Sequence, residues 1–139
     1  MTAAKVAELL RYWQGALGLD HWAVKFDPKE TTDPNDCKAR TWRSASYDRA
    51  AVWLASDWAS WEPHLVEAVI VHELLHLQHR DTDQVFEDLD GQLHRDASSM
   101  IERRYEHAME GFIERLSIQI VELKYGKPLD WSSTVTETP

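Results

Sequence analysis

The stretch VEAVIVHELLHLQH, residues 66–79, contains the side chains whose types and spacing point most directly to chemistry. It holds His72, Glu73 and His76 in the pattern HExxH. On a helix, side chains four residues apart lie on one face, so the two imidazoles can converge on one metal ion. Glu73 is rotated by roughly 100° about the same helix, which directs its carboxylate towards a metal-bound water. The metal lowers the pKa of that water, and Glu73 takes its proton as general base.

The surroundings of this motif favour a metal site over an ordinary core helix. Polar groups on a buried helix cost several kcal/mol unless they are satisfied, and metal ligation satisfies all three together. The alternative is two hydrogen-bonded core histidines and a salt-bridged Glu73. The prediction of burial rests on the apolar residues that surround the motif: Val69, Ile70, Val71, Leu74, Leu75 and Leu77.

His79 lies on the same predicted face as His72 but does not suit a third ligand. Seven residues of helix separate the two and span about 10.5 Å, too far for both to join His76 on one ion. Thr82 stands where the longer metzincin signature would place its third histidine. We therefore expect His79 to be exposed or to contact a ligand without being one.

A catalytic zinc needs three protein ligands and one open position, so a further ligand is required. The next predicted helix, RRYEHAMEGFIERLSIQIVEL, is the expected source, although His94 and Asp96 before it remain candidates. Spacing alone does not identify the third ligand on this helix. Glu102 and Glu106 lie nearest its apolar stripe, and Glu110 lies at the margin of that stripe. The candidates on this helix are Glu102, Glu106, His107, Glu110 and Glu114.

HELLH followed by EGFIERLS resembles small gluzincin-like metallopeptidases of phages and prophages, of the ImmA/IrrE type. In that family a helix reading roughly E-x-x-A-[ND]-x-F-A follows the HExxH helix, and its Glu is the third ligand. The resemblance covers residues 63–123 and implies Glu110 as the ligand, with Glu106 as second choice. The matching offsets are occupied here by Glu110, Ile113, Glu114, Leu116 and Ser117.

The resemblance implies a zinc metallopeptidase that hydrolyses a peptide or protein substrate inside a bacterial or phage-infected cell. His72, His76 and Glu110 would bind Zn²⁺, and Glu73 would be the general base. Tyr105 and His107 flank the third ligand, and either could donate a hydrogen bond to the oxyanion that forms during peptide hydrolysis.

Two other functions are compatible with the motif. The first is a zinc-stabilised binding or regulatory module without turnover. The second is a DNA-associated protease resembling SprT-like proteins, which use a third histidine and carry basic surfaces. The net charge of −9 and the Glu-rich second helix count against this alternative and against nucleic-acid binding in general.

Length and composition bound the remaining possibilities. The chain has 139 residues, which suits one domain, and 43% of them are hydrophobic. Cys37 is the only cysteine, so an internal disulfide and a Cys-rich zinc site are excluded, and we expect a non-catalytic thiol. Charged residues interrupt residues 1–20, which argues against a signal peptide, and no segment is apolar enough for a membrane span. A cytoplasmic protein is expected.

The pattern of elements predicts an α+β fold over residues 1–131, followed by a polar, frayed tail at 132–139. A helix ended by Gly18 is followed by a strand ended by Pro28, and residues 37–56 should form two more strands of a three-stranded antiparallel sheet. The HExxH helix begins at Pro63, and the acidic segment 81–90 is a loop or a short helix. A long helix over 96–125 ends before Gly126.

Two further features of the 37–61 region bear on function. An edge strand there could pair with an extended peptide. The tryptophans could line a substrate cleft or simply fill the core. They are Trp42, Trp53, Trp58 and Trp61.

Overall fold

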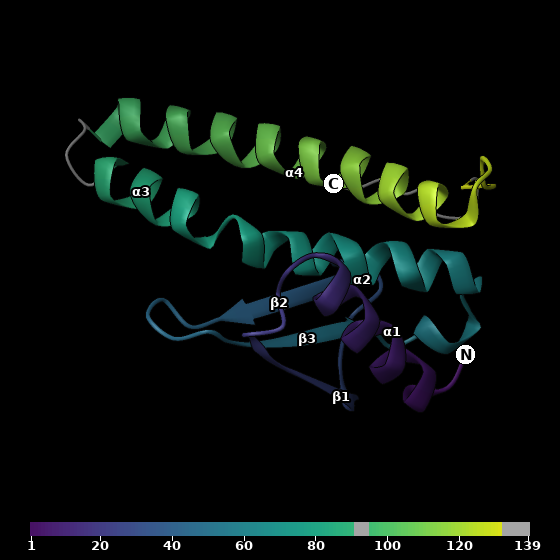
Figure 1. Ribbon diagram of the computed structural model, residues 1–139. Helices are drawn as coiled ribbons and strands as arrows, with labels where there is room; N and C mark the ends of the chain where they lie inside the picture. Colours follow the sequence, from purple (N-terminus) through teal and green to yellow (C-terminus); the bar gives the residue numbers. More distant parts are fainter. Residues whose placement is uncertain (91–94, 132–139) are drawn as a thin grey trace.

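The computed structural model describes residues 1–90 and 95–131, so the predicted tail and the candidate His94 lie outside the described residues. It confirms an α+β fold, with one three-stranded sheet and its helices packed on one side (Figure 1). No helix of the described residues is long and apolar enough to cross a membrane. The elements in chain order are α1 (Ala3–Ala16), β1 (Ala23–Thr32), β2 (Ala39–Arg43), β3 (Arg49–Ala55), the short 3-10 helix η1 (Trp58–Ser60), α2 (Pro63–Gln78), α3 (Arg80–Asp90) and α4 (Arg95–Tyr125).

The sheet is mixed, and the prediction of an antiparallel sheet is therefore wrong in one of its pairings. The strand order is β1-β3-β2, with β2 antiparallel and β1 parallel to β3. The chain leaves β1, crosses the end of β3 and returns through the β2–β3 hairpin. This order places β3 at the centre, where its apolar residues Ala50, Val52 and Leu54 are buried. The central position suits the most apolar strand.

The sequence of strand β1 explains why this strand lies at the edge of the sheet and not at its centre. The sequence predicts that it ends at Pro28, but it continues to Thr32 with a break in its pairing between Phe26 and Thr31. Proline lacks a backbone N–H and is tolerated at an edge or at a bulge, and Pro28 lies at both. Lys25, Asp27 and Lys29 add charge along this edge, which opposes pairing with another chain.

Helix α2 lies between the sheet and α4 and is buried on most sides, as the sequence predicts (Figure 1). Its apolar residues Val66, Ile70, Val71 and Leu74 have no exposed surface. Helix α1 packs beside it, and its C-terminus is followed by Gly18 at φ 72°, a conformation that favours glycine. Helix α2, which carries the HExxH motif, thus packs against both the sheet and α4.

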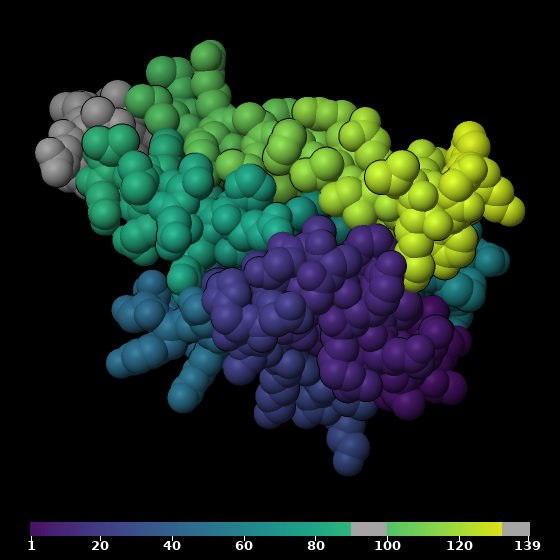
Figure 2. Space-filling model, viewed as in Figure 1, coloured from purple at the N-terminus to yellow at the C-terminus, as the bar shows by residue number. Residues whose placement is uncertain are grey.

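Helices α3 and α4 form an antiparallel pair that extends beyond the sheet (Figures 1 and 2). The segment predicted as a loop or short helix is helical as α3, with the ring of Phe86 stacked on Tyr105 of α4. Helix α4 has 31 residues and ends before Gly126, as predicted. It buries Ile113, Ser117 and Val121 against α2, whereas Leu123 near its C-terminal end is 82% exposed.

A buried carboxylate joins three of the helices at one end of α2. Glu67 is 1% exposed, and its Oε1 accepts hydrogen bonds from Trp13 Nε1 at 2.9 Å and from Lys124 Nζ. The Tyr125 hydroxyl donates to Oε2 at 2.7 Å. The Lys124 ammonium also lies 4.6 Å from the ring centroid of Tyr12. This cluster fixes the C-terminal end of α4 against α1 and α2.

Replacing Lys124 with Met should destabilise the fold by about 3 kcal/mol, because it leaves a buried carboxylate without its cation. Denaturant unfolding followed by circular dichroism measures the difference. Lys127→Met is the control, since Lys127 is exposed beyond the end of α4 and should change stability by less than about 0.5 kcal/mol. Equal effects of the two substitutions would contradict the role assigned to the Glu67 cluster.

Candidate metal centre

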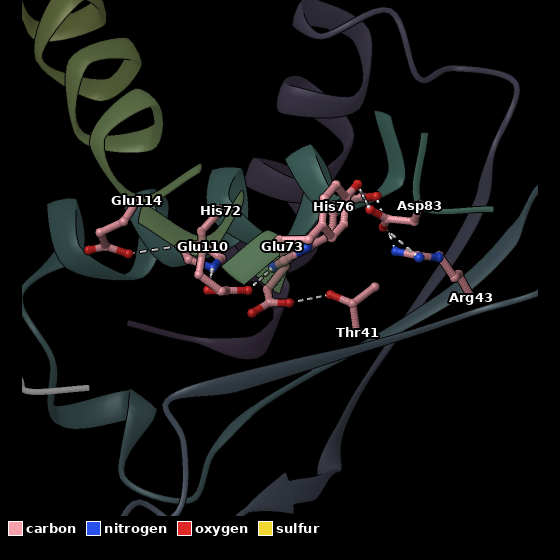
Figure 3. A network of polar contacts seen from close by, with 9 residues as sticks. Thr41, Arg43, His72, Glu73, His76, Asp83, Glu110 and Glu114 are labelled. Atoms are coloured by element: carbon pink, nitrogen blue, oxygen red, sulfur yellow. Dashed lines mark hydrogen bonds and ion pairs between the residues drawn. The ribbon is translucent and has the colours of Figure 1, made fainter. Parts of the chain in front are cut away.

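Helix α2 presents His72 and His76 to α4, where the Glu110 carboxylate lies between them (Figure 3). Glu110 Oε2 is 3.2 Å from His72 Nε2, and Glu110 Oε1 is 2.9 Å from His76 Nε2. The three residues offer ligand atoms that all lie within 4.8 Å of one another. The HExxH spacing thus places both imidazoles as expected, and α4 supplies the carboxylate.

This donor set fits a metal ion that takes nitrogen and oxygen ligands. Ligand distances of about 2.0–2.2 Å in a tetrahedral site place neighbouring donor atoms roughly 3.3 Å apart. Each histidine lies at about this distance from one Glu110 oxygen, 3.2 Å to Oε2 and 2.9 Å to Oε1, and one ligand atom from each of the three residues lies within 4.8 Å of the others. His72 and His76 are partly buried while Glu110 is exposed, so the cluster opens to solvent on one side. An open side is what a catalytic site needs.

Glu114 orients His72 from the other side of its ring. Its Oε2 lies 2.9 Å from His72 Nδ1, which leaves Nε2 directed at Glu110. A carboxylate that holds the second nitrogen of a ligating histidine fixes the ring and increases its basicity. From the sequence, Glu114 is expected only as a candidate ligand. Its position one helical turn after Glu110 was the signal that both carboxylates would face the same histidine.

The carboxylates hold a proton on His72 in the metal-free protein. Burial alone would lower the pKa of His72, but the hydrogen bonds to Glu110 and Glu114 and the charge of Glu73 raise it to about 10. Hydrogen bonds from His72 and His76 hold the pKa of the Glu110 carboxyl well below its usual range. A metal must therefore displace a proton from His72.

Glu73 is the general-base candidate, and its side chain lies beside this cluster (Figure 3). Only 6% of it is exposed, and Thr41 Oγ1 on β2 donates a hydrogen bond to its Oε2. One carboxylate oxygen is thus held by β2, which fixes the direction of the other. Nothing in the sequence identified Thr41, because its role depends on how β2 lies against α2.

A second polar network secures the end of α2 near His76. Arg43 donates to the His76 carbonyl at 3.3 Å and pairs with Asp83 of α3 at 2.7 Å. The Tyr105 hydroxyl donates a hydrogen bond to the same Asp83 carboxylate at 2.5 Å. Burial of the hydroxyl, and secondly this hydrogen bond, raise the pKa of Tyr105 to about 12. The Tyr105 hydroxyl, proposed as an oxyanion donor, is therefore directed at Asp83.

The other candidates from the sequence lie apart from the three-residue cluster. His107 is exposed and lines the cleft described below, so its expected role as an oxyanion donor stays a prediction. Glu102 and Glu106 are exposed on α4 outside the cluster. His79 packs edge-on against Phe112, 5.9 Å between ring centroids, and does not join the ligand atoms.

The cluster lies in a cleft of about 1160 Å³ between β2 and α4, with α2 at its base. Residues 34–41 and Arg43 line one side, and residues of α4 from His107 to Ile118 line the other. Trp131 closes one end. None of the four tryptophans weighed for this role lines the cleft, and Trp131 was missed because it reaches the cleft only through a return of the chain after α4.

Comparisons with protein-family models, with curated proteins and with solved structures found no match for this chain. The assignment of chemistry to the site therefore rests on its residues and their geometry.

Glu110→Ala should weaken zinc binding by about a hundredfold or more, whereas Glu106→Ala should leave it unchanged. The two residues are a matched pair, since both are exposed glutamates of α4 one turn apart and only Glu110 contacts the histidines. Metal content after dialysis and competition with a chromogenic chelator measure the effect. If Glu106→Ala loses zinc and Glu110→Ala retains it, Glu106 and not Glu110 is the third ligand.

Zinc binding at pH 7.5 should release about one proton from His72, because a pKa of about 10 keeps the metal-free ring charged. Affinity should therefore fall as pH is lowered from 10. Calorimetry in buffers of different ionisation enthalpy measures the released protons. In Glu114→Gln the decline should begin at a lower pH, because a carboxylate that raises the pKa is lost. Zinc binding without proton release would mean that His72 is neutral in the metal-free protein.

Proposed function

We propose that this protein is a zinc-dependent metallopeptidase that hydrolyses peptide bonds. The observation that carries the proposal is the placement of the buried Glu73 carboxylate beside the His72, His76 and Glu110 cluster in an open cleft. A merely structural metal site would have no need of a fourth, acidic group facing the same space. Closed structural sites also use four protein ligands, and among the described residues three are brought together here.

Zinc is the metal that this donor set suits best. Two imidazoles and one carboxylate with an open position are typical of catalytic zinc in peptidases. A zinc ion bound there would supply a Lewis acid that activates water and polarises a carbonyl group.

The residues of the chain then have separate tasks. His72, His76 and Glu110 hold the ion, and Glu114 holds the His72 ring by its Nδ1. Glu73 accepts a proton from the attacking water and delivers it to the leaving amine. Thr41 keeps the Glu73 carboxylate in place through its hydrogen bond to Oε2.

The edge of the sheet beside the cleft supports a peptide as substrate. The bonds from Ser44 N to Arg49 O and from Ala55 N to Lys38 O fix the register of β2 on β3. Because bonded pairs alternate in an antiparallel ladder, the backbone groups of residues 39, 41 and 43 point away from β3. An extended peptide could pair with them by strand addition. The resemblance to small gluzincin-like peptidases of the ImmA/IrrE type agrees with this substrate.

Glu73→Gln tests the proposal. It should lower peptide hydrolysis by about a thousandfold, because the amide cannot accept the proton, while zinc content and fold remain. Release of new amino termini from a mixed peptide library, measured beside metal content, gives both quantities. Thr41→Val should lower peptide hydrolysis by a smaller factor, because it removes the hydrogen bond to Glu73 but keeps the Glu73 carboxylate.

Two outcomes would redirect the proposal. A parent protein that binds one zinc per chain but cleaves no peptide would instead be a zinc-stabilised binding module. Salt-dependent affinity for DNA, together with cleavage of DNA-bound protein, would favour the SprT-like alternative.

A further inference from the structure

The antiparallel pair formed by α3 and α4 carries apolar side chains in contact with solvent. The pair extends beyond the sheet (Figures 1 and 2). On α3, Val85 is 59% exposed and Leu89 is 61% exposed, and on α4, Met100 is 51% exposed and Ile101 is 39% exposed. Single apolar residues are common on protein surfaces, whereas contiguous ones mark interaction sites. None of the four lines the cleft, so the proposed peptide hydrolysis gives them no role.

These four apolar residues lie on one flank of the helix pair. The Phe86 ring stacks on Tyr105 with 4.3 Å between centroids, and the Tyr105 hydroxyl donates a hydrogen bond to Asp83. These three side chains therefore lie between the helices and show which face of each helix meets the other. With about 100° between successive residues, the four apolar residues all fall on the same side of the plane through the two helix axes. We call this side the apolar flank.

The two flanks of the pair differ in charge. Glu87, Glu102 and Glu106 are exposed and fall on the side opposite the apolar flank. The apolar flank instead carries the exposed Arg104 on α4 and has the exposed Asp88 at its α3 margin. A surface that approaches the apolar flank thus meets apolar groups bounded by a negative charge on α3 and a positive charge on α4.

Two ring contacts show which residues of α3 and α4 lie level along the pair. His79, just before α3, packs edge-on against Phe112, and Phe86 stacks on Tyr105. The same number of residues separates the two contacts on both sides of the pair. Each step forward along α3 is therefore matched by one step back along α4.

A second copy of the chain complements the apolar flank. Arg104 is within one residue of the level of Asp88, and Ile101 is within one residue of the level of Leu89. A two-fold axis parallel to the helices keeps these levels and lays α3 of each copy on α4 of the other. Each Arg104 then meets an Asp88, and each Ile101 meets a Leu89, so charge and apolar surface match twice. A nucleic acid or an anionic lipid surface would instead meet the negative charge of α3.

We propose that the apolar flank of the α3–α4 pair binds a second copy of the chain, and that the four helices form a two-fold symmetric antiparallel bundle. Apolar side chains lie inside such a bundle and charges lie at its margins. Because α3 has only 11 residues, the interface is small and self-association is weak, with a dissociation constant on the order of ten micromolar. The inference concerns a surface outside the cleft and is independent of the proposed function.

Sedimentation velocity of the full chain, from about 1 to about 300 µM, measures this equilibrium. The parent protein should show a reversible monomer–dimer equilibrium. Leu89→Glu should raise the dissociation constant by roughly tenfold or more, because it places a carboxylate where aliphatic side chains of two copies meet. Leu123→Glu is the matched control at an 82% exposed position near the C-terminal end of α4, and it should leave the constant unchanged. Circular dichroism should give one spectrum for all three proteins, because both leucines are exposed.

Charge reversal tests the two-fold arrangement. Asp88→Arg alone and Arg104→Asp alone each place like charges opposite one another at both contacts, and each should weaken association by about tenfold. An equimolar mixture of the two variants should recover the parent affinity as a heterodimer, because opposite charges then meet again at both contacts. A fluorophore on the amino terminus of one variant makes the mixed species visible in the same sedimentation experiment.

Three outcomes would overturn the proposal. The first is a parent protein that stays monomeric over the whole concentration range. The second is an equal dissociation constant for Leu89→Glu and Leu123→Glu, which would assign self-association to another surface. The third is a mixture of the two charge variants that associates no more strongly than either variant alone, which would exclude the packing of α3 on α4.

Discussion

The polar side chains of the buried helix α2 must all be satisfied, and this constraint decides where the neighbouring elements lie. Glu67 receives hydrogen bonds from α1 and α4, Glu73 from Thr41 of β2, and the histidines meet Glu110 of α4. Among the described residues, no buried side-chain nitrogen or oxygen lacks a partner. Since an unpaired buried polar group costs more than a bond gains, each contact selects one packing over its alternatives.

The two polar clusters that α2 shares with α4 satisfy this constraint in different ways. Glu67 is enclosed by hydrogen-bond donors, and the loss of any of them would leave a buried charge without a partner. Its contacts therefore stabilise the fold. Glu110 is exposed and faces histidines that accept either a proton or a metal. In the metal-free state the charged His72 ring attracts the Glu110 and Glu114 carboxylates and keeps these side chains together. The same pairing that preorganises the site therefore makes protons compete with the metal.

Local patterns in the sequence predict α1, α2, α4 and the shared face of His72 and His76, whereas for α3 they allow either a loop or a short helix. Non-local contacts were not predictable from them. The HExxH spacing fixes which side chains share a face, and Glu110 followed from a family resemblance. The sheet order could not be read in this way, because Pro28 permits either a strand end or an irregular edge. Thr41 and Trp131 gain their roles only from chain segments that meet through the fold, so no local signal marks them.

The cleft is fixed at both ends by contacts that involve no ligand side chain. At one end Arg43 and Tyr105 share the Asp83 carboxylate, which ties β2 to α3 and α4. At the other, the Glu122 carboxylate holds the indole of Trp131 against His64 of α2. Since α4 is held at both ends, the distance between Glu110 and the histidines is set by the scaffold before any metal binds. A site preorganised in this way would lose little free energy to rearrangement on binding a metal ion.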